Sequence, residues 1–189
     1  MAVSPPSLPL SQVGRAAHDI GLAGLLGGNM FGRLALHPSV TEISDETERG
    51  KVVNAAWRRY GTINSISLAA VVAGWLGARA GEAADKRLSD EERRLARAKD
   101  ALVATVALAG LASAVQGVRF AAKAPGGAVP LADGDHVAPQ ASQDVRRAKR
   151  RLNTLGAVAL AAEAGLVAVN AALAQQGFRR PPARRLLRR

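Results

Sequence analysis

One carboxylate stands in the middle of a long apolar stretch near the end of this 189-residue chain. Residues 152–178 have the sequence LNTLGAVALAAEAGLVAVNAALAQQGF, in which Glu163 is the single charged residue. A bilayer core is about 30 Å thick and is crossed by about 20 apolar residues as a helix, so this stretch is long enough to span it. An acid at mid-depth needs a partner or a water-filled cavity, which makes Glu163 a candidate for acid–base chemistry.

Polar residues of other apolar stretches fall near the depth of Glu163 when four helical spans are aligned by their midpoints. At about 1.5 Å per residue, Asn29 and Glu163 lie about 3 Å to the same side of the midplane, with Arg33 further to that side. This placement predicts a polar pocket in which Glu163 is the acid or base and Asn29 or Arg33 orients a ligand. The remaining lining residues would be Asn64, Ser67 and Gln116.

A structural role for the same residues stays open. Arg33 can extend its guanidinium group to the headgroups. Glu163 can accept hydrogen bonds from Asn29 or a serine and hold helices together. A proton or solute pathway is less favoured, because the polar residues lie mainly on one side of the midplane.

Composition excludes several other chemistries. The chain has no cysteine, so disulfides, thiol catalysis and cysteine-ligated metals are excluded. His18 and His37 are about 28 Å apart along one helix and cannot share a metal or haem, and we expect no metal and no cofactor. The net charge is +11, and the basic residues flank the apolar runs with few aromatic residues among them. This pattern favours lipid headgroups over nucleic acid as the partner.

The charge pattern predicts an all-α integral membrane protein, a four-helix bundle with up-down topology. The expected spans are residues 16–37, 60–78, 101–120 and 152–178, which together form one membrane domain from 16 to 178, preceded by a flexible lead (1–15) and followed by an Arg-rich tail (179–189). A soluble Ala-rich bundle is the rival fold. The six aromatic residues lie near the span ends, as in membrane proteins, and favour the membrane fold.

Local signals predict where the helices begin and end. The first span should end at Pro38, since the residue before a proline avoids helical geometry. A short surface helix should follow and break or end near Gly50. Ser89 with Glu92 three residues later predicts a capping box, and Ser142 predicts the cap of the last helix.

Two further features predict surfaces for packing and binding. Gly24, Gly28 and Gly32 lie four residues apart on one helix face, which suits close helix packing within the chain or a seam to a second copy or a membrane-protein partner. The tail predicts a lipid-headgroup contact through Arg179, Arg180, Arg184, Arg185, Arg188 and Arg189.

The N-terminal segment lacks the basic and apolar regions of a signal peptide, so we expect the first span to stay in the protein. Lys and Arg are slightly more frequent on the side of the termini. This asymmetry predicts a bacterial inner (plasma) membrane protein with both termini cytoplasmic.

Residues 20–78 resemble a known pattern. GLLGGNMFGRLALHPSV, an acidic connection and AAWRRYGTINSISLAAVVAG are similar to the anthrone-oxygenase-like four-helix membrane family. The matching positions are Asn29, His37, Trp57 and Arg58. A few members of that family are implicated in cofactor-free oxygenation of aromatic polyketide intermediates, so the resemblance implies a hydrophobic substrate and no cofactor.

Two functional hypotheses follow. The first is a non-catalytic membrane protein, namely a subunit, scaffold or lipid- or partner-binding protein. The alternative is a membrane enzyme acting on a hydrophobic, aromatic polyketide-like substrate with Glu163 as acid or base. The reaction and the ligand are not encoded in any motif of this sequence.

Overall fold

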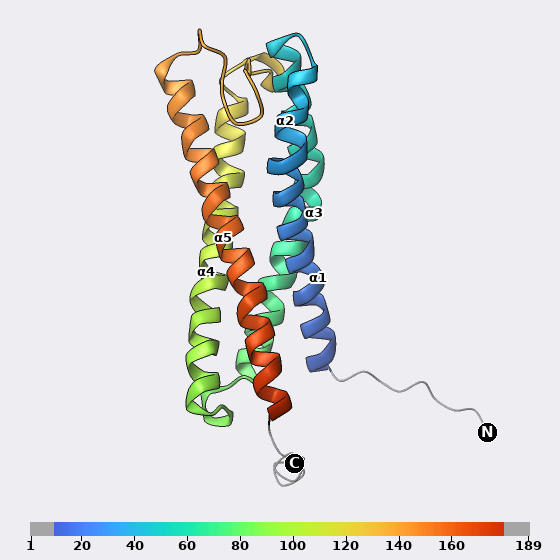
Figure 1. The fold of residues 1–189 in the computed structure, drawn as a ribbon, viewed down its shortest axis with the longest axis vertical. Coiled ribbons are helices and arrows are strands. Elements are labelled where there is room, and N and C mark those ends of the chain that lie inside the picture. The colour runs from blue at the N-terminus through green and yellow to red at the C-terminus, as the bar shows by residue number, and fades with distance from the viewer. Residues whose placement is uncertain (1–9, 180–189) are drawn as a thin grey trace, which may run out of the picture.

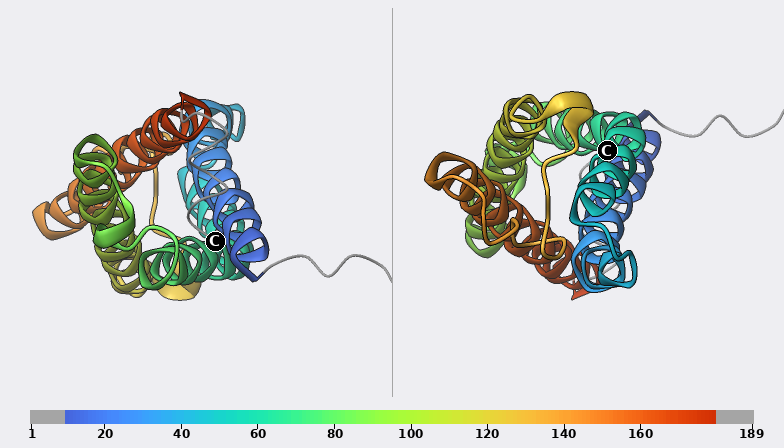
Figure 2. Two further views of the ribbon diagram at one scale, coloured as in Figure 1. Left: turned by 90° about the horizontal axis from the view of Figure 1, so that it is seen from below. Right: turned by 90° about the horizontal axis from the view of Figure 1, so that it is seen from above.

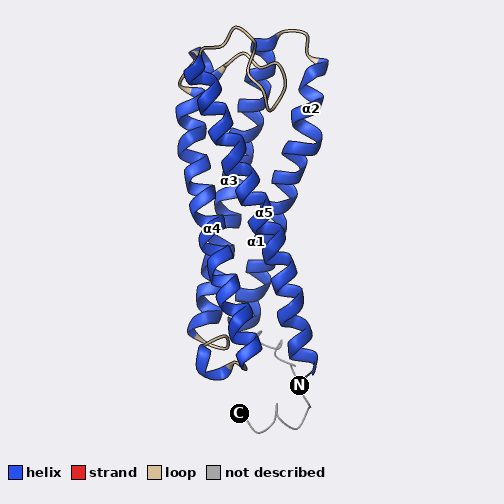
Figure 3. Ribbon diagram, turned by 60° about the vertical axis from the view of Figure 1, so that its left-hand side comes forward, coloured by secondary structure: helices blue, strands red, loops and turns tan. Residues whose placement is uncertain are grey.

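The structure, a computed structural model, describes residues 10–179 and is all-helical, as predicted. Figure 3 shows helices joined by loops over that range. The α-helices are α1 (Leu10–Phe31), α2 (His37–Ser39), α3 (Glu46–Ala80), α4 (Asp90–Ala121) and α5 (Gln143–Arg179). Short turns of other helix types lie at Gly32–Leu36 (π), Val40–Glu42, Asp85–Arg87 and Pro125–Gly127 (all 3-10).

The four long helices lie side by side along one axis (Figure 1). α1 contacts α3 and α5, and α4 contacts the same two helices, so the four form a ring when seen along the long axis (Figure 2). The start of α1 and the connection from α3 to α4 lie at one end. α2 and the loop of residues 122–142 lie at the other, which we call the loop end.

Among the described residues, three helices are long and apolar enough to cross a membrane: α3, α4 and α5. This finding indicates a membrane protein. Three of the four predicted spans thus lie in helices that are long and apolar enough to cross a membrane, whereas α1, with its polar residues and many glycines, is not among them. α1 nevertheless exposes large apolar side chains, with Ile20 at 73% and Phe31 at 64% exposed.

Helix starts follow the sequence signals. Ser89 and Glu92 form the predicted capping box, in which the Ser89 amide donates to Glu92 at 2.8 Å. The amide of Val145 donates to the Ser142 hydroxyl at 3.4 Å, as expected for its cap. At α3 the cap is Asp45, which accepts from the Glu48 amide at 2.8 Å. These contacts satisfy amides that have no partner within the helix.

The expected break near Gly50 was wrong, because α3 runs without interruption from Glu46 to Ala80. Gly50 is buried, and the backbone of Val129 in the 122–142 loop lies directly against it. The glycine is there to admit a close backbone approach, a tertiary contact that local helix propensity does not report.

The α-helical run ends close to the expected Pro38, because α2 ends at Ser39 and a 3-10 turn follows. The expected reason was wrong, because the residue before the proline, His37, keeps helical angles (φ −62°, ψ −44°). A π-helical turn, Gly32–Leu36, precedes the proline, and in it the His37 amide donates to the Gly32 carbonyl oxygen. A proline lacks an amide donor and its ring crowds the carbonyl four residues earlier, and a wider turn relieves that crowding. α1 and α2 therefore form one nearly continuous rod (Figure 1).

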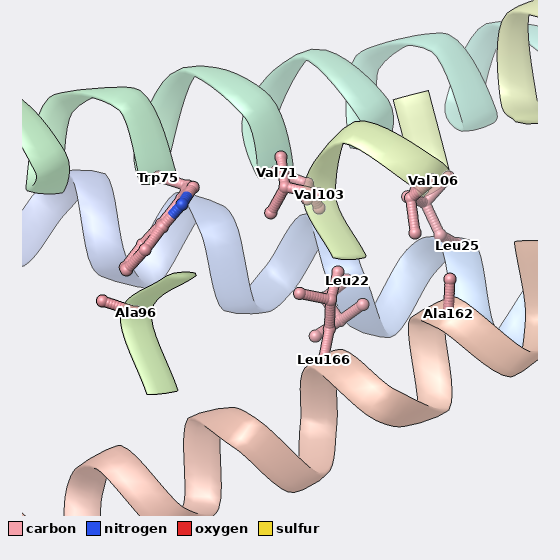
Figure 4. Packing of buried hydrophobic residues seen from close by; sticks show 9 residues of the cluster. All are labelled: Leu22, Leu25, Val71, Trp75, Ala96, Val103, Val106, Ala162 and Leu166. Carbon is pink, nitrogen blue, oxygen red and sulfur yellow. The ribbon is translucent and has the colours of Figure 1, made fainter. Parts of the chain in front are cut away.

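Two apolar clusters hold the helices together. The larger lies between the long helices and includes Leu22, Val71, Trp75, Val106 and Leu166 (Figure 4). The smaller lies at the loop end, where Leu131 of the 122–142 loop packs with Val40 and Val53. The loop is therefore part of the fold.

Gly50→Ala tests whether the loop is bound to α3. A Cβ at residue 50 would lie 2.0 Å from the Val129 carbonyl oxygen, so we expect the free energy of unfolding to fall by about 1–3 kcal/mol. Gly61→Ala is the matched control on α3, since a Cβ there meets nothing within 4 Å. It should leave stability unchanged or raise it by up to about 1 kcal/mol. Equal melting temperatures of the two variants in detergent would contradict the packing of the loop against Gly50.

Candidate functional site

Glu163 lies in the interior of α5 with 2% of its surface exposed. The side-chain nitrogen of Asn29, from α1, donates to both carboxyl oxygens at 2.8 and 3.0 Å. The depth comparison of the sequence therefore brought together the correct pair. The contact joins α1 to α5 among apolar neighbours, where a hydrogen bond has little competition from water.

Arg33 lies one turn beyond Asn29 and binds α5 by a different route. Its guanidinium group donates to the Asn153 carbonyl oxygen at 2.6 Å. Asn153 in turn donates from its side chain to the Asp135 carbonyl oxygen at 2.8 Å. Arg33 thus joins the turn after α1 to α5, Asn153 joins α5 to the loop, and Arg33 has no hydrogen bond to Glu163.

His37 is the centre of the polar contacts at the loop end and is 7% exposed. Its Nδ1 lies 3.0 Å from a carboxyl oxygen of Asp135, and its Nε2 accepts from the Trp57 indole at 3.2 Å. The His37 carbonyl oxygen accepts from the Gly134 amide at 3.0 Å. Since Nε2 accepts, the ring hydrogen is on Nδ1 and faces Asp135. Both ring nitrogens are therefore engaged, which holds the imidazole rigidly.

Lys149, near the start of α5, is buried beneath the loop. It is 7% exposed, donates to the Gly134 carbonyl oxygen and lies 5.9 Å from the centre of the Phe120 ring. Burial lowers the pKa of Lys149 to about 8, against the opposing effect of Asp135 and Asp133. Sequence reasoning missed both Lys149 and Asp135, because the Asp-Gly-Asp-His turn that joins them gives no sign of its distant contacts.

A second polar group lies toward the other end of the helices. His18 is buried, with Nδ1 2.7 Å from the Val71 carbonyl oxygen, and Asn170 donates to Asp19 at 3.2 Å. Lys99 is 6% exposed, and its ammonium group lies 4.2 Å from the centre of the Trp75 ring. Burial lowers the pKa of Lys99 to about 8.

An apolar layer separates the two polar groups. On α1 it contains Leu22 and Leu25, between Asp19 and Asn29, and on α5 it contains Leu166, between Glu163 and Asn170. Figure 4 shows Leu22 and Leu166 meeting between α1 and α5. Leu166 has no exposed surface. The polar side chains therefore do not form one continuous line through the molecule.

The glycine face of α1 is turned toward α3. A Cβ at Gly24 would meet Ser67, one at Gly28 would meet Tyr60, and one at Gly32 would meet Trp57. The face is thus used for packing within the chain at these three positions. Tyr60 also donates to the Gly24 carbonyl oxygen at 2.5 Å.

The other expected lining residues do not gather around Glu163. Ser67 is buried against the glycine face, and Asn64 is half-buried on α3. Gln116 lines a groove of about 730 Å³ between α4 and α5 at the loop end. A second groove, of about 360 Å³, lies between α1 and α3 against Trp57 and Tyr60. Neither groove is lined by Glu163 or Asn29.

Within the described residues, no three His, Asp or Glu side chains converge in a way that could hold a metal ion. The predicted headgroup contacts of the tail fall outside the description: the chain beyond Arg179 is not described, nor is the Arg179 side chain. Comparison with protein-family models, curated proteins and solved structures finds no match to this chain.

The buried Lys149 predicts a pH dependence of stability. Its pKa is about 8 in the folded protein against 10.5 ordinarily, so the unfolded state binds more protons between those values. The free energy of unfolding should therefore rise with pH from about 8 to about 10. Lys149→Met removes this contribution and should show a smaller rise in melting temperature over that window than the wild type. Identical pH profiles would contradict the burial of the ammonium group.

Proposed function

We propose that this chain is a non-catalytic four-span membrane protein with up-down topology, acting as a subunit, scaffold or lipid-binding protein. One observation carries the proposal: Glu163, the acid in the interior, is closed off and paired with Asn29 at 2.8 and 3.0 Å. A catalytic acid or base must reach a substrate. This carboxyl group reaches a neighbouring helix, and so its contact supports a role in joining α1 to α5.

The contacts of α1 support its role as a fourth span despite its low hydropathy. Two of its polar side chains turn inward, His18 against α3 and Asn29 against α5. The exposed Asp19 accepts from Asn170 of α5, while Ile20 and Phe31 face outward. A helix can cross a bilayer in this way when its polar groups are satisfied by neighbouring helices.

The proposed location is a bacterial inner membrane with the termini on the cytoplasmic side, and it rests on the charge distribution of the sequence. Because the chain has no cysteine, single cysteines introduced in place of Lys86 or Lys123 can be labelled to determine this orientation. Both lysines are exposed and lie at opposite ends of the helices.

The apolar layer at Leu22, Leu25 and Leu166 argues against a proton or solute pathway. A pathway needs polar groups or water along its whole length. The layer interrupts the polar side chains between Glu163 and Asn170.

A membrane enzyme is the second candidate, and the groove between α1 and α3 is the observation that favours it. The groove is apolar, and its wall includes Trp57, whose indole binds His37. Two of the four positions of the resemblance to the anthrone-oxygenase-like family therefore meet beside a space suited to a hydrophobic substrate. Glu163 does not line this groove, so the proposed enzyme would not use it for direct acid–base chemistry there.

Two substitutions of Glu163 test the structural role. Glu163→Gln should change stability little, because the glutamine oxygen can still accept from Asn29. Glu163→Leu should lower the free energy of unfolding by about 1–3 kcal/mol, because it leaves the Asn29 amide without a partner in the interior. Both are measured by thermal unfolding of purified protein in detergent.

The opposite pattern would overturn the proposal. A catalytic Glu163 predicts that Glu163→Gln folds normally and abolishes turnover, with the loss independent of stability. If Glu163→Gln and Glu163→Leu destabilised the protein equally, the hydrogen bond with Asn29 would not explain how Glu163 stabilises the fold.

A further inference from the structure

We propose that the groove between α4 and α5 at the loop end is a binding site for an anionic phospholipid, with its phosphate at the arginines and an acyl chain on the apolar floor. The inference rests on the proposed membrane function and deepens it, because it names a ligand class and a site. The groove has a volume of about 730 Å³.

Four arginines form the charged half of the groove: one from α4 (Arg119) and three from α5 (Arg147, Arg150 and Arg151). The three on α5 fall within one helical turn and face the same partner helix. Among the described residues, no aspartate or glutamate lines the groove. Guanidinium groups are suited to phosphate, since each presents a planar fork of donors to its oxygens.

The four positive charges are not neutralised by carboxylates of the described residues. Arg147 has a long hydrogen bond of 3.4 Å to the Gln143 side chain. None of the four arginines forms an ion pair with another described residue. Arginines at the opposite end behave differently, since Arg15 pairs with Glu82 and Arg79 with Asp85. The groove therefore holds excess positive charge that an external anion can balance.

The other half of the groove is apolar and lies deeper along the helices. It is lined by Leu111, Ala112 and Val115 of α4 and by Leu155 of α5. Leu111 precedes Arg119 by eight residues, which is about 12 Å along a helix. Leu111 is 60% and Val115 52% exposed in the isolated chain, so this floor faces outward.

The polarity of the groove matches the depth profile of a bilayer. Arg119 directly follows the uncharged run of α4, and Arg151 directly precedes that of α5, which places both at headgroup level. Gln116 and Thr154 lie at the boundary between the charged and apolar halves. A free phosphate would use only the charged half. A nucleic acid would find no aromatic side chain for base stacking in the lining.

The test measures retention of phosphatidylglycerol and of phosphatidylcholine by the full-length protein, using native mass spectrometry in detergent. The groove variant is Arg119→Gln with Arg150→Gln. The matched control is Arg58→Gln with Arg59→Gln, two exposed arginines at the same end that do not line the groove. Both variants lose the same net charge.

We expect the wild type to prefer phosphatidylglycerol by at least about tenfold, since arginines near the headgroup favour an anion. The groove variant should lose about thirtyfold in affinity for it, as expected for two arginines at a membrane surface. The control should lose less than about threefold. Equal losses in the two variants, or equal retention of the two lipids, would overturn the site.

Two parallel measurements separate the causes of failure. Alkaline carbonate extraction of membranes reports integration: release of the wild-type protein would overturn the proposed membrane function and the site with it, whereas retention without lipid preference overturns the site alone. Inorganic phosphate is then added as a competitor. Displacement of the lipid by phosphate at equal concentration would show that the apolar floor contributes nothing, and this too would overturn a phospholipid site.

Discussion

The hydrogen bonds from Asn29 to Glu163 constrain where α1 can lie against α5. A buried carboxyl group and a half-buried amide between apolar helices are costly unless they bind each other, so the two helices are held in one register. This register also fixes the positions of Arg33 and His37, which follow Asn29 at intervals of four residues. Arg33 binds α5, and His37 binds the loop. The adjacent face of α1 carries the glycines that admit α3. α1 thus meets two helices through two different kinds of surface.

The loop end extends the same organisation beyond the apolar runs. The backbone of the 122–142 loop binds α2 and α3, and the buried Lys149 anchors it from α5 through the Gly134 carbonyl oxygen. Burying an ammonium group has a desolvation cost, which is reflected in its lowered pKa. Arg147, Arg150 and Arg151, which are exposed on α5, form no ion pair with the described residues. The start of α5 therefore combines a buried lysine that anchors the loop with exposed arginines.

Features that depend on helix geometry could be predicted from the sequence, and features that depend on distant loops could not. The Asn29–Glu163 pair follows from depth along two helices, and the Ser89–Glu92 cap follows from local spacing. The use of Gly50 within α3 could not be predicted, because Val129, whose backbone lies against it, is far along the chain. The contact of Asp135 with His37 likewise needs the folded loop. The expected pocket around Glu163 failed because Gln116 faces the outer groove and Ser67 faces the glycines.

A double-mutant cycle on Asn29 and Glu163 tests the central contact most directly. Asn29→Leu, Glu163→Leu and the double variant are compared by their free energies of unfolding in detergent. If the two side chains hold α1 to α5, each single variant leaves a buried polar group unpaired, and the double variant is more stable than the sum of the single losses by about 1–3 kcal/mol. If the losses in the free energy of unfolding add within about 0.5 kcal/mol, the two side chains act independently, and their contact does not hold α1 to α5.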